Sequence, residues 1–215
     1  MTLVFPRLMP RVGANSQSFE PQEIGFLSPE QGGRLGSIRA GTPIWTMMVD
    51  LNNMREHDAD TWRAWVAAQR GPGRWFYGFE IGREVPRFHR GGTPFTATPS
   101  GWSQAIAGDG TAYLTLHGLL PGMHLTTGDY AGFKWDGWKR SLVRALEPAQ
   151  ADAGGNATFA IEPPVHPVTP PGASANLNRP DCLMRLDIAN TKLGRQTLGY
   201  TAAGSSLSAA QDLIP

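Results

Sequence analysis

Residues 61–78, TWRAWVAAQRGPGRWFYG, restrict the fold of this chain more than any other segment. Large or apolar side chains recur there at steps of three and four residues, which is the spacing of one face of an α-helix. The residues on this face are Ala59, Trp62, Trp65 or Val66, and Gln69. The sequence therefore predicts an amphipathic helix that buries aromatic side chains.

The ends of this helix carry their own signals. Asp58 is predicted as the N-cap, and Asp60 places negative charge on the first turn, where the helix dipole favours it. Gly71 supplies a left-handed C′ position, and Pro72 stops the helix. We therefore predict one helix over residues 58–70.

The segment Arg74–Phe79 follows with three aromatic residues in a strand-length run. The clearest strand is Ile44–Leu51, because alternate residues form one fully apolar face of Trp45, Met47, Val49 and Leu51. A turn is expected around Pro21. The remaining segments also indicate strands, turns and loops, so the predicted fold is mainly β with one helix. Further strands are expected at 3–8, 17–20, 24–27, 34–40, 111–116, 130–138, 141–146, 157–161 and 182–188.

Composition favours many short strands and a covered surface. The chain has 26 Gly and 18 Pro among 215 residues without a triplet period, which is typical of strands joined by tight turns. Charged residues make up 17% of the chain, whereas about a quarter is typical of soluble domains. Together with seven Trp, this low charge indicates that partners cover part of the surface.

Charge and targeting signals exclude several classes. The formal net charge is +1, so neither nucleic acid nor an anionic membrane is a predicted partner. The basic cluster 134–144 is interpreted as a solvated strand face. No apolar run is long enough for a transmembrane helix, and the N-terminus lacks the apolar core of a signal peptide. Synthesis and folding in a cytoplasm are expected.

The order of segments predicts a discontinuous domain. Six prolines between 163 and 181 indicate an extended return path, after which the strand 182–188 rejoins the first sheet. We therefore expect residues 1–85 and 163–190 to share one domain, with residues 98–160 inserted as a small β domain. Residues 191–215 form a predicted C-terminal tail that only neighbouring molecules order.

A series of short motifs follows the chain in order. They are an N-terminal Phe-Pro strand, SQSFEP at 16–21, GTPIW at 41–45, RGPGRWFYG at 70–78, Gly128-Asp129, and RPDCLMRL at 179–186. In this order they resemble the distal tail proteins and related tail-hub proteins of long-tailed bacteriophages, prophages and gene transfer agents. The resemblance spans about residues 3–188. Directly after Gly78, members of this family often continue with an acidic turn, where this chain has Phe79-Glu80-Ile81.

The resemblance implies a fold and a function. Its first and last segments would form a tail-tube-like β-sandwich with one packed α-helix. The inserted domain would be a small β-barrel, OB-like or galectin-like. Six copies would form a ring at the virion tail tip, with the tail tube protein above and hub and fibre proteins below or outside. The expected function is a structural virion protein that joins the tail tube to the baseplate.

No catalytic, cofactor-binding or metal-binding residue is predicted. His57 and Asp58 are explained by their place at the start of the helix. Glu147 and Glu162 are interpreted as solvated acids, and the alternative for these two residues is a glycosidase carboxylate pair. The single cysteine, Cys182, is interpreted as a buried apolar residue. An enzyme is therefore the least favoured class.

A carbohydrate-binding module for receptor recognition is the alternative function. Aromatic rings beside polar groups suit sugar stacking, and such residues concentrate in the predicted insert. They are Trp102, Tyr113, Tyr130, Phe133, Trp135 and Trp138. Core packing accounts for the same residues, and a sugar site could coexist with a ring.

Overall fold

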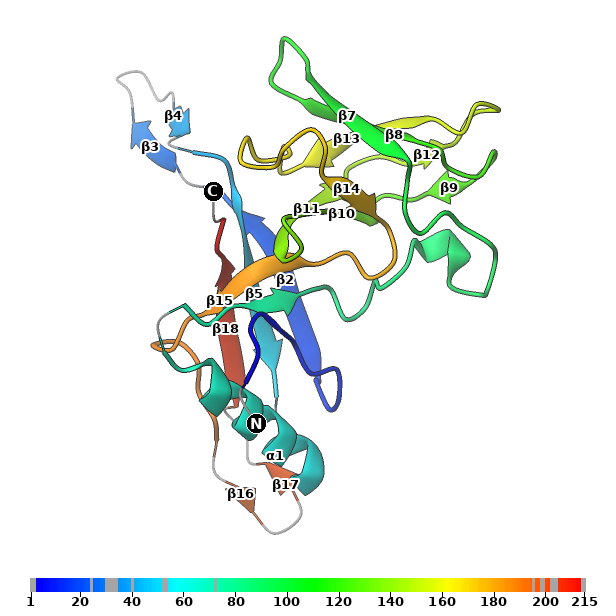
Figure 1. The fold of residues 1–215 in the computed structure, drawn as a ribbon. Helices are drawn as coiled ribbons and strands as arrows, with labels where there is room; N and C mark the ends of the chain where they lie inside the picture. The colour runs from blue at the N-terminus through cyan, green and yellow to red at the C-terminus, as the bar shows by residue number, and fades with distance from the viewer. Residues whose placement is uncertain are drawn as a thin grey trace.

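The structure is a computed structural model of the chain. It describes residues 3–23, 25–29, 35–39, 41–51, 54–71, 73–194, 196–197, 200–201 and 205–213. Over these residues the protein is mainly β with one α-helix, which confirms the predicted fold class. Two six-stranded sheets lie side by side, and each has its own apolar core (Figure 1).

The first block is the sheet that joins the two ends of the chain, together with the helix. Its strand order is β1-β6-β15-β18-β5-β2, with β1 parallel to β6 and the other pairs antiparallel. The strands are β1 (Arg7–Leu8), β2 (Ser16–Gln22), β5 (Ile44–Asp50), β6 (Phe76–Gly78), β15 (Cys182–Leu186) and β18 (Ser206–Gln211). The strand Cys182–Leu186 therefore rejoins the first sheet by pairing with β6, as expected.

Strand β5 shows the alternation that its sequence predicts. Trp45, Met47 and Val49 are buried on one face, and Leu51 continues this row just after the strand. Met48, on the other face, is 57% exposed. The buried row forms the centre of the first core, because neighbouring strands add Phe19 and other apolar residues to the same face.

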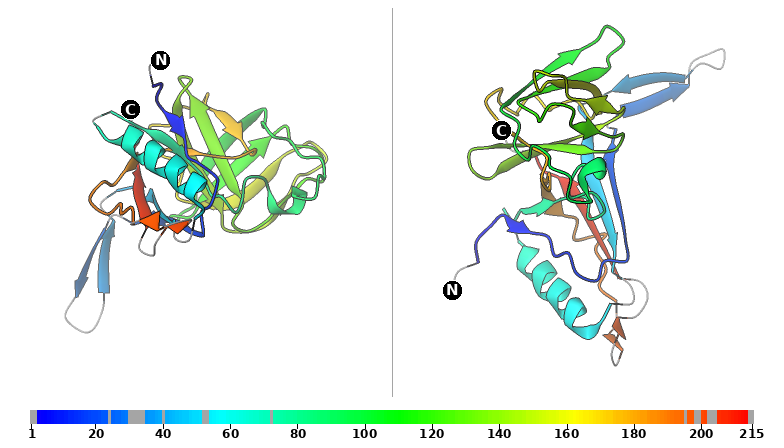
Figure 2. Two further views of the ribbon diagram at one scale, coloured as in Figure 1. Left: turned by 90° about the horizontal axis from the view of Figure 1, so that it is seen from below. Right: turned by 90° about the vertical axis from the view of Figure 1, so that its right-hand side faces the viewer.

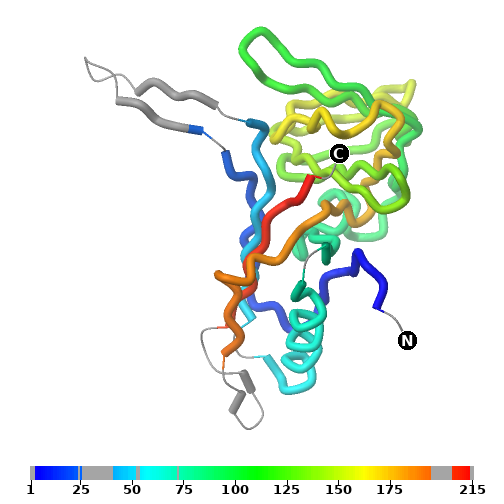
Figure 3. Tube along the Cα trace, turned by 60° about the vertical axis from the view of Figure 1, so that its left-hand side comes forward, coloured from blue at the N-terminus to red at the C-terminus, as the bar shows by residue number. Residues whose placement is uncertain are grey.

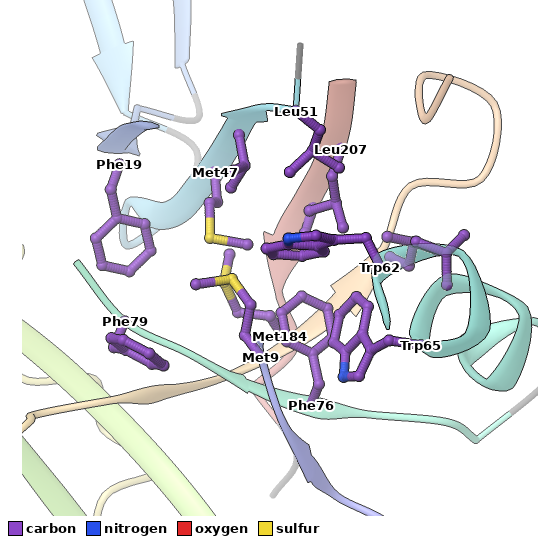
Figure 4. Packing of buried hydrophobic residues seen from close by; sticks show 14 of the residues in the cluster. Met9, Phe19, Met47, Leu51, Trp62, Trp65, Phe76, Phe79, Met184 and Leu207 are labelled. Carbon is purple, nitrogen blue, oxygen red and sulfur yellow. The ribbon is translucent and has the colours of Figure 1, made fainter. Parts of the chain in front are cut away.

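Helix α1 (Glu56–Gln69) covers this buried face. Its buried residues are Ala59, Trp62, Trp65, Val66 and Gln69, which confirms the face predicted from the sequence. Trp65 packs edge-on against Phe76 of β6, with ring centroids 4.8 Å apart, and against Trp62 at 5.8 Å (Figure 4). Sheet and helix together therefore enclose an aromatic core.

The predicted N-cap is wrong. The helix begins at Glu56 with Arg55 at the N-cap position, and no side chain caps it. Asp58 lies inside the first turn, and Asp60 lies beyond it. At the other end Gly71 has φ +136°, consistent with the predicted glycine role. Pro72, predicted to stop the helix, lies outside the described residues.

A smaller effect is therefore expected for Asp58→Ala than the loss of a cap would give. Asp58 acts only through its charge near the positive end of the helix dipole, which is worth about 0.3 to 1 kcal/mol. Urea unfolding at low and high salt measures this, and salt is expected to shrink the loss. Asp60→Ala, outside the first turn, is the matched control. A salt-independent loss above about 1.5 kcal/mol would restore the capping role.

The prediction for the C-terminal residues is also wrong. Ser206–Gln211 forms β18, which lies inside the first sheet between β15 and β5. Leu207 and Ala209 are buried in the first core. Just before this strand, β16 (Gln196–Thr197) and β17 (Tyr200–Thr201) pair with each other. The chain itself therefore orders this part of the segment 191–215, without a neighbouring molecule.

The second block is a curled sheet with the order β14-β10-β11-β13-β8-β7. Its edges approach each other, because the Trp102 Nε1 on β7 donates to the Ala173 carbonyl beside β14 (2.8 Å). No ladder joins β7 to β14 in the described part of the chain, so the barrel stays a prediction. The strands of this sheet are β7 (Gly101–Ile106), β8 (Ala112–His117), β10 (Tyr130–Trp135), β11 (Lys139–Ala145), β13 (Ala157–Glu162) and β14 (Ser174–Asn176). The second block also contains a separate strand pair, β9 (His124–Leu125) with β12 (Ala149–Gln150), and the short 3-10 helix η1 (Arg87–His89).

The predicted boundary of the insert needs a correction. Residues 163–177 belong to the second block, because β14 pairs with β10 and Val165, Ala175 and Leu177 are buried in the second core. The prolines of this segment suggested a return path, but the apolar residues between them fill the core. The chain leaves the second block only near Pro180.

A two-stranded ribbon projects from the body of the first block. Strands β3 (Gly25–Pro29) and β4 (Leu35–Arg39) pair with each other, with no other strand beside them among the described residues, and extend away from both sheets (Figures 1 and 2). Figure 3 shows β2, in blue, running alongside β5, in cyan, within the first sheet. The predicted turn at Pro21 is wrong, because Pro21 lies within β2 opposite Trp45. An edge strand accommodates this proline.

Candidate functional site

The most extensive cluster of polar and aromatic side chains lies where the two blocks meet. We call it the joint, and strand β11 forms its centre. Leu142 is buried in the first core, whereas Val143 and Ala145 are buried in the second. Because alternate residues of a strand point to opposite faces, β11 contributes one face to each block.

Aromatic rings fill the middle of the joint. Trp45 of the first block stacks on Phe19, with centroids 4.9 Å apart and planes at 24°. Tyr130 of the second block packs against both rings, at 5.6 and 6.1 Å. The Trp45 Nε1 donates to the Leu142 carbonyl at 2.7 Å. The first core therefore depends on side chains and backbone of the second block.

An arginine closes the solvent side of these rings. The Arg144 guanidinium lies 5.6 Å from the Trp45 ring centroid. It pairs with Glu20 of β2 at 2.6 Å and with Glu162 of β13 at 3.3 Å. Glu20 is well exposed, so this pair adds little stability by itself. Its contribution is to fix the position of β11 against the edge strand β2.

A second arginine of β11 forms a buried ion pair. The Arg140 Nε lies 3.2 Å from the Asp181 Oδ1, and the guanidinium covers the Tyr77 ring at 4.8 Å. Burial raises the pKa of Asp181, and the neighbouring Arg140 opposes that rise. Neither of the two atoms has a hydrogen bond in the described structure. Each of these two buried charges therefore compensates the other.

Close backbone packing brings these groups together. A Cβ on Gly132 of β10 would lie 3.2 Å from the Pro180 Cα and 3.3 Å from the Asp181 nitrogen. Glycine therefore lets the chain return to the first block directly beneath β10. The aromatic, ionic and backbone contacts together hold the two blocks as one packed unit.

A hollow of about 420 Å³ opens beside the joint. Its lining includes Glu20, Glu80, Arg83, Tyr130 and Arg144. Burial raises the pKa of Glu80, and burial raises the pKa of Tyr130 to about 12. In both cases burial opposes ionisation of the side chain. The lining contains both acidic and basic side chains, as is common where two parts of a protein pack against each other.

The candidate catalytic and metal-binding residues of the sequence lie apart from this joint or have structural roles. His57 is exposed on the first turn of α1. Glu147 accepts a hydrogen bond from the Ala160 nitrogen at 2.9 Å, and Glu162 pairs with Arg144. Cys182 is fully buried, which confirms its interpretation as a core residue, and burial raises the pKa of its thiol. In the described ranges, no three His, Cys, Asp or Glu side chains gather as metal ligands.

The aromatic residues that are candidates for sugar stacking do not form one continuous binding surface. Tyr130 is buried in the first core and Phe133 in the second. Trp102 packs on Phe133 at 4.6 Å, and Trp138 packs on Trp75 at 5.7 Å with planes at 38°. These rings are divided between two cores and the outside of the joint.

The packing of the two blocks around β11 was not predicted from the sequence. The basic cluster 134–144 was interpreted as a solvated face, and this is wrong for Arg140 and Arg144. The signal was present, because β11 carries apolar residues on both faces, which indicates a strand buried on two sides. It did not indicate which other segment would lie against the second face.

The outer face of the first sheet is a candidate contact surface. Charged residues lie at the margins of this face, namely Glu20, Asp50 and Arg185. The other facing positions on β2, β5 and β18 carry small or uncharged side chains around the exposed Met48. They are Ser16, Ser18, Thr46, Ser206, Ser208 and Ala210. Strand β2 forms one edge of this sheet, with no further strand beside it in the part of the chain that the structure describes. Unpaired edges of this kind are sites where another chain can add.

Comparison of the sequence with protein-family models and with curated proteins finds no match. Within the described residues, no helix has the length and apolar character needed to cross a membrane.

Proposed function

We propose that the protein is a structural virion protein of the distal tail type. In this proposal six copies form a ring at the tail tip that joins the tail tube to the hub or baseplate. The observation that carries the proposal is the discontinuous first block. Segments from both ends of the chain build one sheet, helix α1 packs on it, and residues between them form a second block beside it.

The surfaces of the first block suit such a role. A ring of like subunits covers sheet edges that would be exposed in a monomer, and the first block has the open edge β2. The centre of its outer face carries small or uncharged side chains around Met48, with Glu20, Asp50 and Arg185 at the margins, and this suits contact with another protein. The motif series resembling distal tail proteins lies mainly in this block and in the joint.

The joint changes what the second block contributes. Because Tyr130 and Leu142 belong to the first core, the second block supports the ring-forming sheet. Replacing residues 98–160 by a short Gly/Ser bridge would uncover Trp45 and Phe19 and would leave Asp181 without Arg140. The deletion is therefore expected to destabilise the first block, so it cannot separate the roles of the two blocks.

Disruption of the gene for this protein in the genome that encodes the particle tests the proposed function. We expect particles with arrested or tipless tails, and restoration by the intact chain supplied in trans. Tails of normal length and tip structure in the disrupted strain would contradict the proposal. Electron microscopy of purified particles is the measurement, with head counts as the control for particle assembly in general.

A further inference from the structure

A notch of about 490 Å³ lies between the two blocks, at the end of the molecule that carries the β7–β8 hairpin. Pro43 of the first block lines one side, and the hairpin turn Asp109–Thr111 lines another. Leu146 and Pro164 are also part of the lining. The notch is therefore built from both blocks and keeps its form because the joint holds them together.

The chemistry of the notch combines apolar and acidic groups. Leu146 is exposed at its wall, and Ile106, which pairs with the lining residue Ala112, is 63% exposed. Asp109 and Glu162 add carboxylates, although Glu162 also pairs with Arg144. A segment with apolar side chains and a basic residue would complement such a surface.

The chain presents such a segment at its other end. We call residues 3–12 the N-terminal strip. Leu3, Leu8 and Val12 are exposed there, and Val4 is 78% exposed. The guanidinium of Arg7 has no ion-pair partner among the residues that the structure describes.

The strip is held in a fixed position. The Trp65 Nε1 donates to the Leu8 carbonyl at 2.8 Å, and the Trp62 Nε1 donates to the Val12 carbonyl at 2.7 Å. The Arg7 nitrogen donates to the Trp75 carbonyl at 3.3 Å. Its exposed apolar side chains are therefore presented by an ordered backbone, which lowers the entropy that binding would cost.

We propose that the notch of one copy binds the N-terminal strip of a second copy. The strip lies beside β6 and α1, whereas the notch lies beside the turn of the β7–β8 hairpin, and the two surfaces share no residue. The occupant that we propose is therefore the strip of another copy. Contact between two different patches is heterologous, and it closes into a ring when the rotation between copies allows it. The inference rests on the proposed ring and assigns one contact between its subunits.

Cysteine cross-linking tests the contact directly. The native Cys182 is fully buried, so introduced surface cysteines are the ones expected to react. Full-length Val4→Cys and Leu146→Cys chains are mixed at high concentration and oxidised, and a mixed dimer is expected. Val4→Cys with Ile188→Cys is the matched control, because Ile188 is exposed but outside the notch lining. Equal yields for both pairs, or no Val4–Leu146 product, would overturn the inference.

A charge exchange gives a second readout. Arg7→Asp and Asp109→Lys should each lower the yield of the Val4–Leu146 product at least several-fold, since like charges then face each other. The two changes carried on the same chain should restore the yield. Two single losses without restoration would mean that these charges do not meet.

The outcomes also separate this inference from the proposed function. A chain carrying both Val4→Cys and Leu146→Cys should give a cross-linked series that ends at six copies. A series ending at another number would keep the strip-to-notch contact and contradict the hexamer. Six-copy rings that show no Val4–Leu146 product would keep the proposed function and refute the contact.

Discussion

Trp65→Ala is expected to lower the free energy of unfolding by about 3 to 5 kcal/mol. The side chain is buried between Trp62 and Phe76, and its indole nitrogen donates to the Leu8 carbonyl. The substitution removes a large apolar surface and leaves a cavity at the contact between α1 and the sheet. Chemical denaturation followed by circular dichroism measures the loss, and assembly into tails should fail.

Phe88→Ala is the matched control for this prediction. Phe88 is also aromatic, but it is 55% exposed on η1 of the second block. Its removal should change the free energy of unfolding by less than about 1 kcal/mol. A Trp65→Ala protein as stable as the Phe88→Ala protein would show that α1 contributes little to the first core.

Arg140→Met is expected to destabilise the protein by about 3 to 5 kcal/mol at pH 7, because it removes the ion-pair partner of the buried Asp181 carboxylate and leaves only the weaker influence of Lys134 and Arg179. Burial already raises the pKa of Asp181, and loss of Arg140 removes the largest opposing influence. The folded protein then favours the protonated carboxyl more strongly than the unfolded chain does.

The sign of the pH dependence follows from this shift. Below about pH 4, near the ordinary pKa of an aspartate, Asp181 is protonated in both states and adds no penalty. As the pH rises through the raised folded pKa, the penalty grows to its full size. The Arg140→Met protein should therefore lose more stability than the wild type between pH 4 and pH 7.

A double substitution isolates the carboxylate as the cause. In Arg140→Met/Asp181→Asn no charge is buried, so the extra loss between pH 4 and pH 7 should disappear. Other titrating groups are common to both variants and cancel in the comparison. The same pH dependence in both variants would mean that Asp181 does not carry the effect.

Elements with a strict period were predictable from the sequence. The buried row of β5 and the five buried residues of α1 follow directly from steps of two and of three to four residues. Strand β18 was not predicted because its buried positions are Leu207, Ala209 and Gln211, and its other positions are two serines and an alanine, which gives too little contrast between its faces. Only pairing with β5 and β15 makes this segment a strand.

The joint could not be assembled from local patterns. Arg140 and Asp181 are far apart in sequence, and their pairing depends on the return of the chain beneath β10 at Gly132. The Asp58 cap failed for a simpler reason, since the helix begins two residues earlier, at Glu56. Long-range packing and the exact first turn of a helix are both decided by tertiary contacts.

The central claim is that this chain forms a ring at the tip of a virion tail. Imaging of intact tails by cryo-electron microscopy tests it most directly, with the chain located by fitting its two-block shape into the density. We predict six copies in one ring between the tail tube and the hub. Density for a different protein at that position, or a ring with another number of copies of this chain, would contradict the claim.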